Sequence, residues 1–242
     1  MKSISRTLMM AMALTVATTG VAMATPSTQI WIPSTDIQAF KTLHLGIDNY
    51  TRTSGSGSRP NVYDLGLTAG VLPFEKVQAE IGIDYITNGD DTYDSNPLYF
   101  NAKVATPEAA LFSVSPALAV GIYGAGTKSD LTDQNVVYGL VAKTLPVVGR
   151  LSAGYYKGND KVIGSEDDGV LLSWDRTLSE ISDKLWAAVD YQGGDNALGA
   201  LSFGVSWAFS PNVSVIVGYD IYNDNALAGE DTFTTQLDIN FL

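Results

Sequence analysis

Charged side chains occupy alternate positions of otherwise apolar segments along most of this sequence. The carboxylates are Asp48, Asp64, Glu80, Asp84, Asp175, Asp190, Asp220 and Asp238, and the cations are Lys103, Lys143 and Arg150. Alternate residues of a β-strand share one face, so these groups would line one side of a sheet. A charged carboxylate is costly in a dry core, so the acidic excess implies water or partner cations. We expect an acidic surface that attracts cations.

Residues suited to catalysis or metal binding are scarce. The sequence has one histidine, His44, and no cysteine, which excludes a thiolate zinc site and a multi-histidine cluster. It contains neither a GxSxG nor an HExxH motif. We therefore expect no enzymatic activity, no cofactor and no metal, with His44 serving as a hydrogen-bonding residue.

The charge balance excludes nucleic acid as a partner. The 14 Lys+Arg and 26 Asp+Glu give a net charge of −12, which a polyanion would repel. Many of the acidic residues gather in connections between apolar segments: Asp90, Asp91, Asp94, Asp130, Asp133, Asp160, Glu166, Asp167, Asp168, Asp195, Asp224, Glu230 and Asp231. Acidic connections of this kind would concentrate cations or attract a basic partner.

The elements that position these residues are predicted to be about twelve β-strands. Each segment is rich in Val, Ile, Leu and Tyr, and most alternate apolar and polar residues with period two. In segment 77–87, Ile81, Ile83 and Tyr85 oppose Glu80 and Asp84. The predicted strands are 41–51, 61–72, 77–87, 97–105, 117–125, 135–145, 149–158, 169–176, 184–192, 198–209, 212–222 and 232–242.

Two kinds of connection alternate between these segments. Long ones rich in Gly, Asn, Asp and Ser, such as 88–96 and 159–168, alternate with mostly compact ones that often contain proline, such as 145–149. Segments 106–116 and 177–183 are predicted to form short helical turns. This arrangement predicts an all-β fold, an up-and-down antiparallel barrel with long loops at one end and both termini at the other.

The composition of the two strand faces favours a transmembrane barrel. One face is apolar without interruption, and the other carries Gly, Ser, Thr, Asn and scattered carboxylates, as in barrels with lipid outside and a polar lumen. Only 17% of the residues are charged. Aromatic residues form two predicted girdles at the membrane interfaces: Tyr63, Tyr85, Tyr191, Tyr219 and Phe233 near the long loops, and Trp174, Trp207, Phe209 and Phe241 near the short turns.

The N-terminal region divides into two predicted parts. Lys2 and Arg6, an apolar stretch from residue 8 to 21 and the small residues around Ala24 indicate a cleaved signal peptide over 1–24, and hence export. We interpret residues 25–40 as a periplasmic lead-in to the barrel domain, 41–242. An alternative hypothesis is that Trp31 folds into the lumen and constricts it.

Together these features resemble the outer-membrane β-barrel, or porin-like, proteins of Gram-negative bacteria. The resemblance rests on the signal sequence, the strand series and the final strand TFTTQLDINFL, with Phe241 near its end. The opening STQIWIPSTDIQ at 27–38 is also similar to the start of uncharacterised porin-like proteins of metal-reducing proteobacteria.

The resemblance implies a location in the cell outer membrane, surrounded by lipid. It also implies a passive channel for small cations or small polar solutes, and it allows a homo-oligomer, since porins are often trimers. The alternative is a closed structural barrel whose acidic loops anchor it or dock an extracellular partner. A twelve-stranded barrel can hold a narrow channel or be closed by side chains. Inward glycines such as Gly46, Gly66, Gly82, Gly204 and Gly218 either leave room or admit bulky groups.

Overall fold

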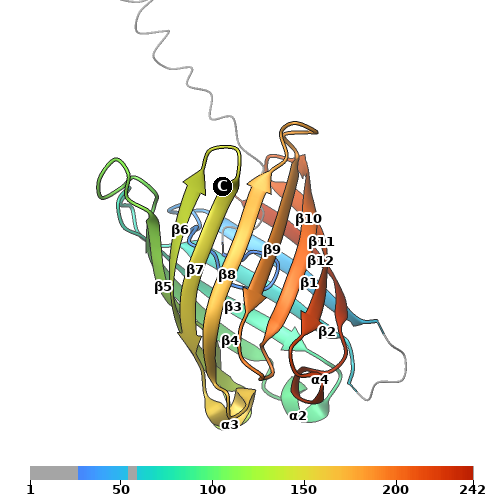
Figure 1. Cartoon of the computed structure of the whole chain (residues 1–242). Helices are drawn as coiled ribbons and strands as arrows, with labels where there is room; N and C mark the ends of the chain where they lie inside the picture. The colour runs from blue at the N-terminus through green and yellow to red at the C-terminus, as the bar shows by residue number, and fades with distance from the viewer. Residues whose placement is uncertain (1–26, 54–58, 242) are drawn as a thin grey trace, which may run out of the picture.

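A computed structural model describes residues 27–53 and 59–241 of the chain. The predicted signal peptide, residues 1–24, lies outside the described residues. The described chain forms one closed barrel, in which each strand pairs antiparallel with the next and the last strand pairs with the first (Figure 1).

Twelve strands make up this barrel, which confirms the predicted fold. The bounds are β1 (Leu43–Arg52), β2 (Val62–Gly70), β3 (Gln78–Thr87), β4 (Leu98–Thr106), β5 (Ala117–Gly126), β6 (Asp133–Leu145), β7 (Gly149–Lys157), β8 (Asp168–Thr177), β9 (Leu185–Gln192), β10 (Ala200–Ser210), β11 (Val213–Tyr222) and β12 (Thr232–Phe241). Each predicted segment matches one of these strands to within two residues at either end, because period-two alternation reflects the two faces of a strand directly.

Three one-turn helices lie at the long-loop end of the barrel (Figure 1): α2 (Asp91–Asp94), α3 (Asp160–Ile163) and α4 (Asn225–Ala228). Their N-caps are Asp90, Asn159 and Asp224, whose side chains accept hydrogen bonds from backbone N–H groups of the first turn. Segments 106–116 and 177–183, predicted to form short helical turns, form hydrogen-bonded turns with no longer helix in either. Among the described helices, none has the length and apolar character of a membrane span.

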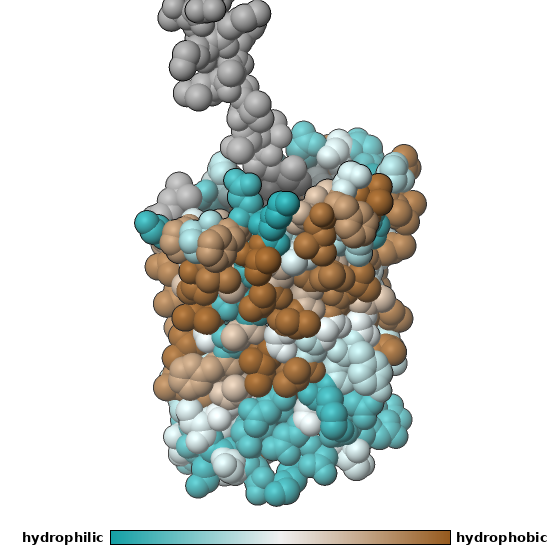
Figure 2. All heavy atoms as spheres, turned by 90° about the vertical axis from the view of Figure 1, so that its left-hand side faces the viewer, coloured by the Kyte–Doolittle hydropathy of each residue, from teal (hydrophilic) through white to brown (hydrophobic). Residues whose placement is uncertain are grey.

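The outer surface carries an apolar belt. Outward residues of the strands, such as Leu65, Ile81 and Val205, are about half exposed. Figure 2 shows this belt as a broad hydrophobic band above a polar cap at the long-loop end. Six of the predicted girdle aromatics are among the exposed hydrophobic residues: Tyr63, Tyr85, Phe233, Trp207, Phe209 and Phe241. An outer belt of this kind suits contact with lipid rather than water.

The N-terminal segment folds inside the barrel. We call residues 27–40 the N-terminal plug; in Figure 1 it is the blue trace within the ring of strands. It turns back on itself, since the Gln29 N–H donates to the Ile32 carbonyl at 2.8 Å and the Ser34 N–H to the Ser27 carbonyl at 3.0 Å. Ile30 and Ile32 are fully buried. The segment interpreted as a lead-in outside the barrel therefore lies in its lumen.

Candidate functional site

The centre of the plug is held by the β9 carboxylate of Asp190. One of its oxygens accepts hydrogen bonds from the backbone N–H groups of Ile30, at 2.7 Å, and Trp31, at 3.1 Å. On another wall, the Gln236 side-chain amide donates to the Ile30 carbonyl at 2.8 Å. The Trp31 indole N–H donates to the Leu198 carbonyl at 2.8 Å. The bonds to Asp190 and Gln236 satisfy backbone groups of Ile30 and Trp31.

Both ends of the plug meet a buried ion pair. Lys103 Nζ lies 3.1 Å from Glu80 Oε1, and both side chains are almost fully buried. Glu80 also accepts hydrogen bonds from the Ser27 hydroxyl at 2.8 Å and the Gln38 N–H at 2.7 Å, while Lys103 donates to the Ser27 and Ser34 carbonyls. Because every charge has several partners, the pair is compensated despite its burial.

A second ionic cluster links the plug to β7 and β8. Arg150 contacts Asp36 of the plug at 2.6 Å and Asp175 of β8 at 2.9 Å. Asp175 accepts further hydrogen bonds from the Gln29 side chain at 3.0 Å and the Trp186 indole at 3.2 Å. The inward charges on this side of the barrel therefore bind protein groups.

Apolar packing adds to these polar anchors. Ile32 lies in a buried cluster with residues of β6, including Val136, Tyr138 and Leu140. Ile30 packs with Trp186 and Ile216 in a second cluster. Burying an isoleucine side chain contributes roughly 1.5–3 kcal/mol, so these two residues together stabilise the inserted plug substantially.

Two of the inward glycines make room for the plug. Gly204 and Gly218 are cross-strand partners on β10 and β11. A Cβ atom added at either one would lie 3.0–3.1 Å from Ile30 side-chain carbons. On this wall, small residues admit a bulky group.

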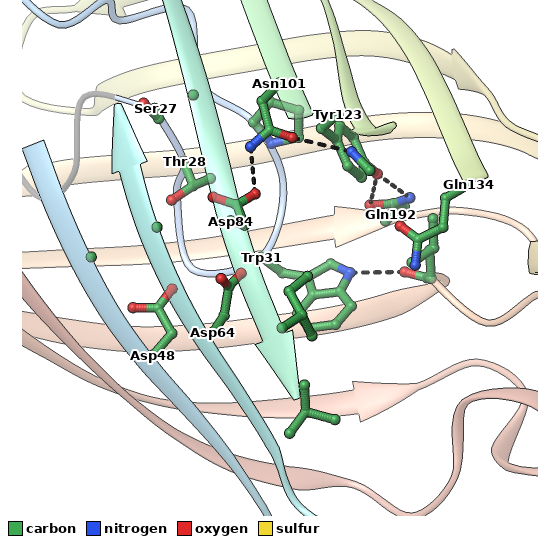
Figure 3. A pocket seen from close by; sticks show the side chains of 18 of the residues that line it. Ser27, Thr28, Trp31, Asp48, Asp64, Asp84, Asn101, Tyr123, Gln134 and Gln192 are labelled. Carbon is green, nitrogen blue, oxygen red and sulfur yellow. Dashed lines mark hydrogen bonds between the residues drawn. The ribbon is translucent and has the colours of Figure 1, made fainter. Parts of the chain in front are cut away.

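The opposite wall, formed by β1 to β5, is left partly open. A cavity of about 360 Å³ remains between this wall and the plug, and its lining includes Asp48, Asp64 and Asp84 (Figure 3). A Cβ added at Gly46, on the same wall, would meet no atom closer than 3.6 Å. At Gly46 the missing side chain leaves free space, so both interpretations of the inward glycines apply, on opposite walls.

The predicted pore residues fall into three groups: those that line the cavity, those that bind other protein groups on the inner face, and one on the outer face. The cavity is lined by Asp48, Asp64, Glu80, Asp84 and Lys103. The other inner-face residues bind protein groups. Arg150 and Asp190 bind the plug, and Asp220 is fully buried and accepts a hydrogen bond from Thr232 at 2.8 Å.

Lys143 lies elsewhere, which corrects its assignment to the lumen. It pairs in register with the exposed Leu151, on the outer face of the barrel near the short turns, and its ammonium lies 2.6 Å from Glu108. The inward residues of β6 are Val136, Tyr138, Leu140 and Ala142. Because this strand has lipid on one side and the apolar plug cluster on the other, its sequence does not alternate and gives no indication of which face is which.

Several side chains that bind inner-wall charges or line the cavity could not be predicted from the sequence pattern. Asp36 and Gln29 of the plug bind inner-wall charges, and Arg52, at the loop end of β1, lines the cavity while donating to the Ala228 and Glu230 carbonyls. The uninterrupted apolar run from Val136 to Ala142 was the available signal that one inner wall is not polar. His44 is buried, with Nδ1 3.2 Å from the Asn240 side-chain oxygen, as expected for a hydrogen-bonding residue.

Several loop carboxylates have structural partners outside the membrane-spanning strands. Asp94 accepts hydrogen bonds from the Asn88 N–H at 2.9 Å, the Thr87 hydroxyl at 2.7 Å and the Gly89 N–H at 3.0 Å. These bonds, led by that from Asn88, hold the pKa of Asp94 below its usual value because they favour the charged form. In the part of the chain that the structure covers, no group of three acidic or histidine residues has a metal-binding arrangement.

Fold and surface together define a membrane-spanning β-barrel with a plugged lumen. Neither a family model nor a curated protein sequence matches this chain. Among solved structures, the KdgM porin matches with a TM-score of 0.50 at 6% identity, covering 83% of this chain and 98% of that porin. At this identity the similarity concerns the fold alone.

Two further outer-membrane proteins have lower scores. The COG4313 outer membrane channel from Pseudomonas putida F1 matches with a TM-score of 0.48 at 13% identity, over 85% of this chain and 97% of that channel. A variant of the Rh. blastica porin matches with a TM-score of 0.42 at 10% identity, over 83% and 98% of the two chains.

Proposed function

We propose that this protein is a narrow outer-membrane channel through which small cations or small polar solutes diffuse passively. The observation that carries the proposal is the cavity beside the plug, whose wall presents Asp48, Asp64 and Asp84. Within the described residues, none of these carboxylates has a Lys, Arg or His partner within 4.0 Å. Uncompensated carboxylates along a water-accessible path favour cations over anions.

The position of the cavity supports a path along the barrel axis. Its lining extends from Arg52 and Ala228 near the long loops to Glu80 and Lys103 toward the short turns. The proposed orientation places the long loops outside the cell and the short turns in the periplasm, as in other outer-membrane barrels. The plug restricts the passage to one side, so the proposed channel conducts less than an open barrel of this size.

Recordings from the refolded protein in a planar bilayer test this proposal. We expect discrete open levels. Under a salt gradient, the reversal potential should be displaced toward the equilibrium potential of the cation. The double variant D48N/D64N should move the reversal potential toward zero, because two carboxylates leave the passage. The matched control D183N removes a charge from an exposed turn and should leave it unchanged.

A folded barrel that stays electrically silent would overturn the proposal. It would favour the alternative function, a closed barrel that acts through its acidic loops. The observation in favour of that alternative is the plug itself, which fills the β7 to β11 side of the lumen. Heat-modifiable migration on a gel establishes in each case that the barrel is folded.

A further inference from the structure

The cavity beside the plug has two unlike walls. Asp48, Asp64 and Asp84 project from β1, β2 and β3 on one side, and the Trp31 indole lies across from them on the plug (Figure 3). From these walls we infer that the cavity binds a small organic cation, an ammonium group attached to an apolar body. The inference names the class of solute for the proposed channel. The statement that this ligand is the channel's solute rests on the proposed function.

The acidic wall lacks a partner for its charge. Asp48 and Asp64 are directly opposite each other in the β1–β2 register, an arrangement in which like charges destabilise a sheet. Asp64 Oδ1 is buried without a hydrogen bond in the described part of the chain. A cation that enters the cavity would relieve this repulsion and satisfy that oxygen.

A buried histidine on the same wall gives a second indication of a binding site. His44 is 4% exposed and lines the cavity, and its Nε2 has no hydrogen-bond partner among the described residues. The charged group nearest to it is Asp238, whose Oδ1 lies 3.5 Å away and also lacks a hydrogen bond. Buried polar atoms are usually satisfied, so these atoms indicate that a polar ligand or water completes the wall.

The cations of the cavity lining do not neutralise this wall. Lys103 is paired with Glu80 at 3.1 Å and donates to two plug carbonyls. Arg52, at the loop end, donates to carbonyl oxygens of the α4 loop at 2.5 and 2.9 Å. Both side chains are engaged and leave the charge of the acidic wall uncompensated. One oxygen of Asp84 accepts a hydrogen bond from the neutral Asn101 side-chain amide, which does not cancel that charge.

The aromatic wall is rigid. Trp31 is oriented by its indole hydrogen bond to Leu198, and its ring makes edge contacts with Tyr50 and Tyr222 at centroid distances of 5.4 and 5.6 Å. Tryptophan is the strongest partner for a cation among aromatic residues, and it also packs well against apolar groups. A rigid indole opposite carboxylates suits a ligand that is charged at one end and apolar at the other.

These features distinguish an organic cation from other ligands. An inorganic ion would leave the apolar wall unused, and the described residues offer no cluster with metal-binding geometry. A neutral molecule would leave the carboxylates unpaired, and an anion would be repelled. The volume of about 360 Å³ lies within the roughly 300–1,000 Å³ typical of small-molecule sites.

Calorimetric titration of the folded full barrel in a non-ionic detergent tests the inference. The probes are phenethylammonium, 2-phenylethanol, which lacks the charge, and methylammonium, which lacks the apolar body. We expect phenethylammonium to bind at least tenfold more tightly than either of the others. D48N/D64N and W31L should each weaken its binding at least tenfold, whereas D183N should not.

Each contrary outcome is informative. Equal binding of 2-phenylethanol, equal binding of methylammonium, or no binding of phenethylammonium to a folded barrel would each overturn the inference. Bilayer recordings separate it from the channel proposal. Cation-selective currents that phenethylammonium does not change would overturn the binding site alone, and a silent barrel that still binds phenethylammonium would overturn the channel alone.

Discussion

The substitution D190N should release the N-terminal plug without unfolding the barrel. Asp190 accepts hydrogen bonds from two backbone N–H groups of the plug, at 2.7 and 3.1 Å. A hydrogen bond to a charged group contributes roughly 1.5–3 kcal/mol, and one to a neutral group about 0.5–1.5 kcal/mol. An amide oxygen retains the geometry and loses the charge, so insertion of the plug should weaken by roughly 2–3 kcal/mol.

This free energy corresponds to a change of roughly 30- to 150-fold in the population of the displaced plug, since every 1.4 kcal/mol is a factor of ten. The sequence has no cysteine, so a single reporter can be introduced cleanly. In an I32C background, where the native side chain is fully buried, the rate of modification by a water-soluble maleimide reports plug displacement. The rate follows the displaced population when the plug returns faster than it reacts.

We expect modification to accelerate by the same factor in I32C/D190N, while heat-modifiable migration shows an intact barrel. I32C/D183N is the matched control, because Asp183 lies in an exposed turn and takes part in none of the plug contacts described above. An unchanged rate in I32C/D190N would refute the argument that Asp190 anchors the plug.

Three further predictions follow from the same contacts. G46V should lower single-channel conductance because its side chain enters the cavity, whereas G218V should raise it by displacing Ile30; changes of the same sign would contradict the division of the lumen. K103M should lower barrel stability by about 3–5 kcal/mol, measured by urea unfolding, because Glu80 is left buried and unpaired; an unchanged midpoint would refute this. Asp94 has a lowered pKa, so the α2 loop should keep its order at neutral pH and lose it only as pH falls below the ordinary aspartate range. NMR measurement of Gly89 amide exchange checks this, and loss of protection at a pH above that range would contradict it.

The strand series and the acidic wall could be predicted from the sequence because both follow from local alternation. Where one face meets lipid and the other meets water, as around Asp48 on β1 and Asp84 on β3, the side chains record which face is which. The same alternation placed girdle aromatics such as Tyr63 and Trp207 on the outer surface.

Local alternation fails where both faces of a strand are apolar. On β6, Val137 and Val141 are exposed on the outside, while Tyr138 and Leu140 pack in the cluster that includes Ile32 of the plug. The sequence of β6 therefore does not indicate which residues face inward, and the prediction placed Lys143 on the wrong face. Only the location of the plug explains why this part of the inner wall is apolar.

The sequence by itself determined a twelve-stranded barrel with an apolar exterior and inward carboxylates, because these features depend on neighbouring residues. The tertiary structure decided which carboxylates remain free. Asp190 and Gln236 both form hydrogen bonds with the Ile30 backbone, although they lie 160 and 206 positions away from it in the sequence. Contacts between such distant residues leave no periodic signal, so the division of the lumen into a plugged side and an acidic cavity appears only once the barrel has closed around the plug.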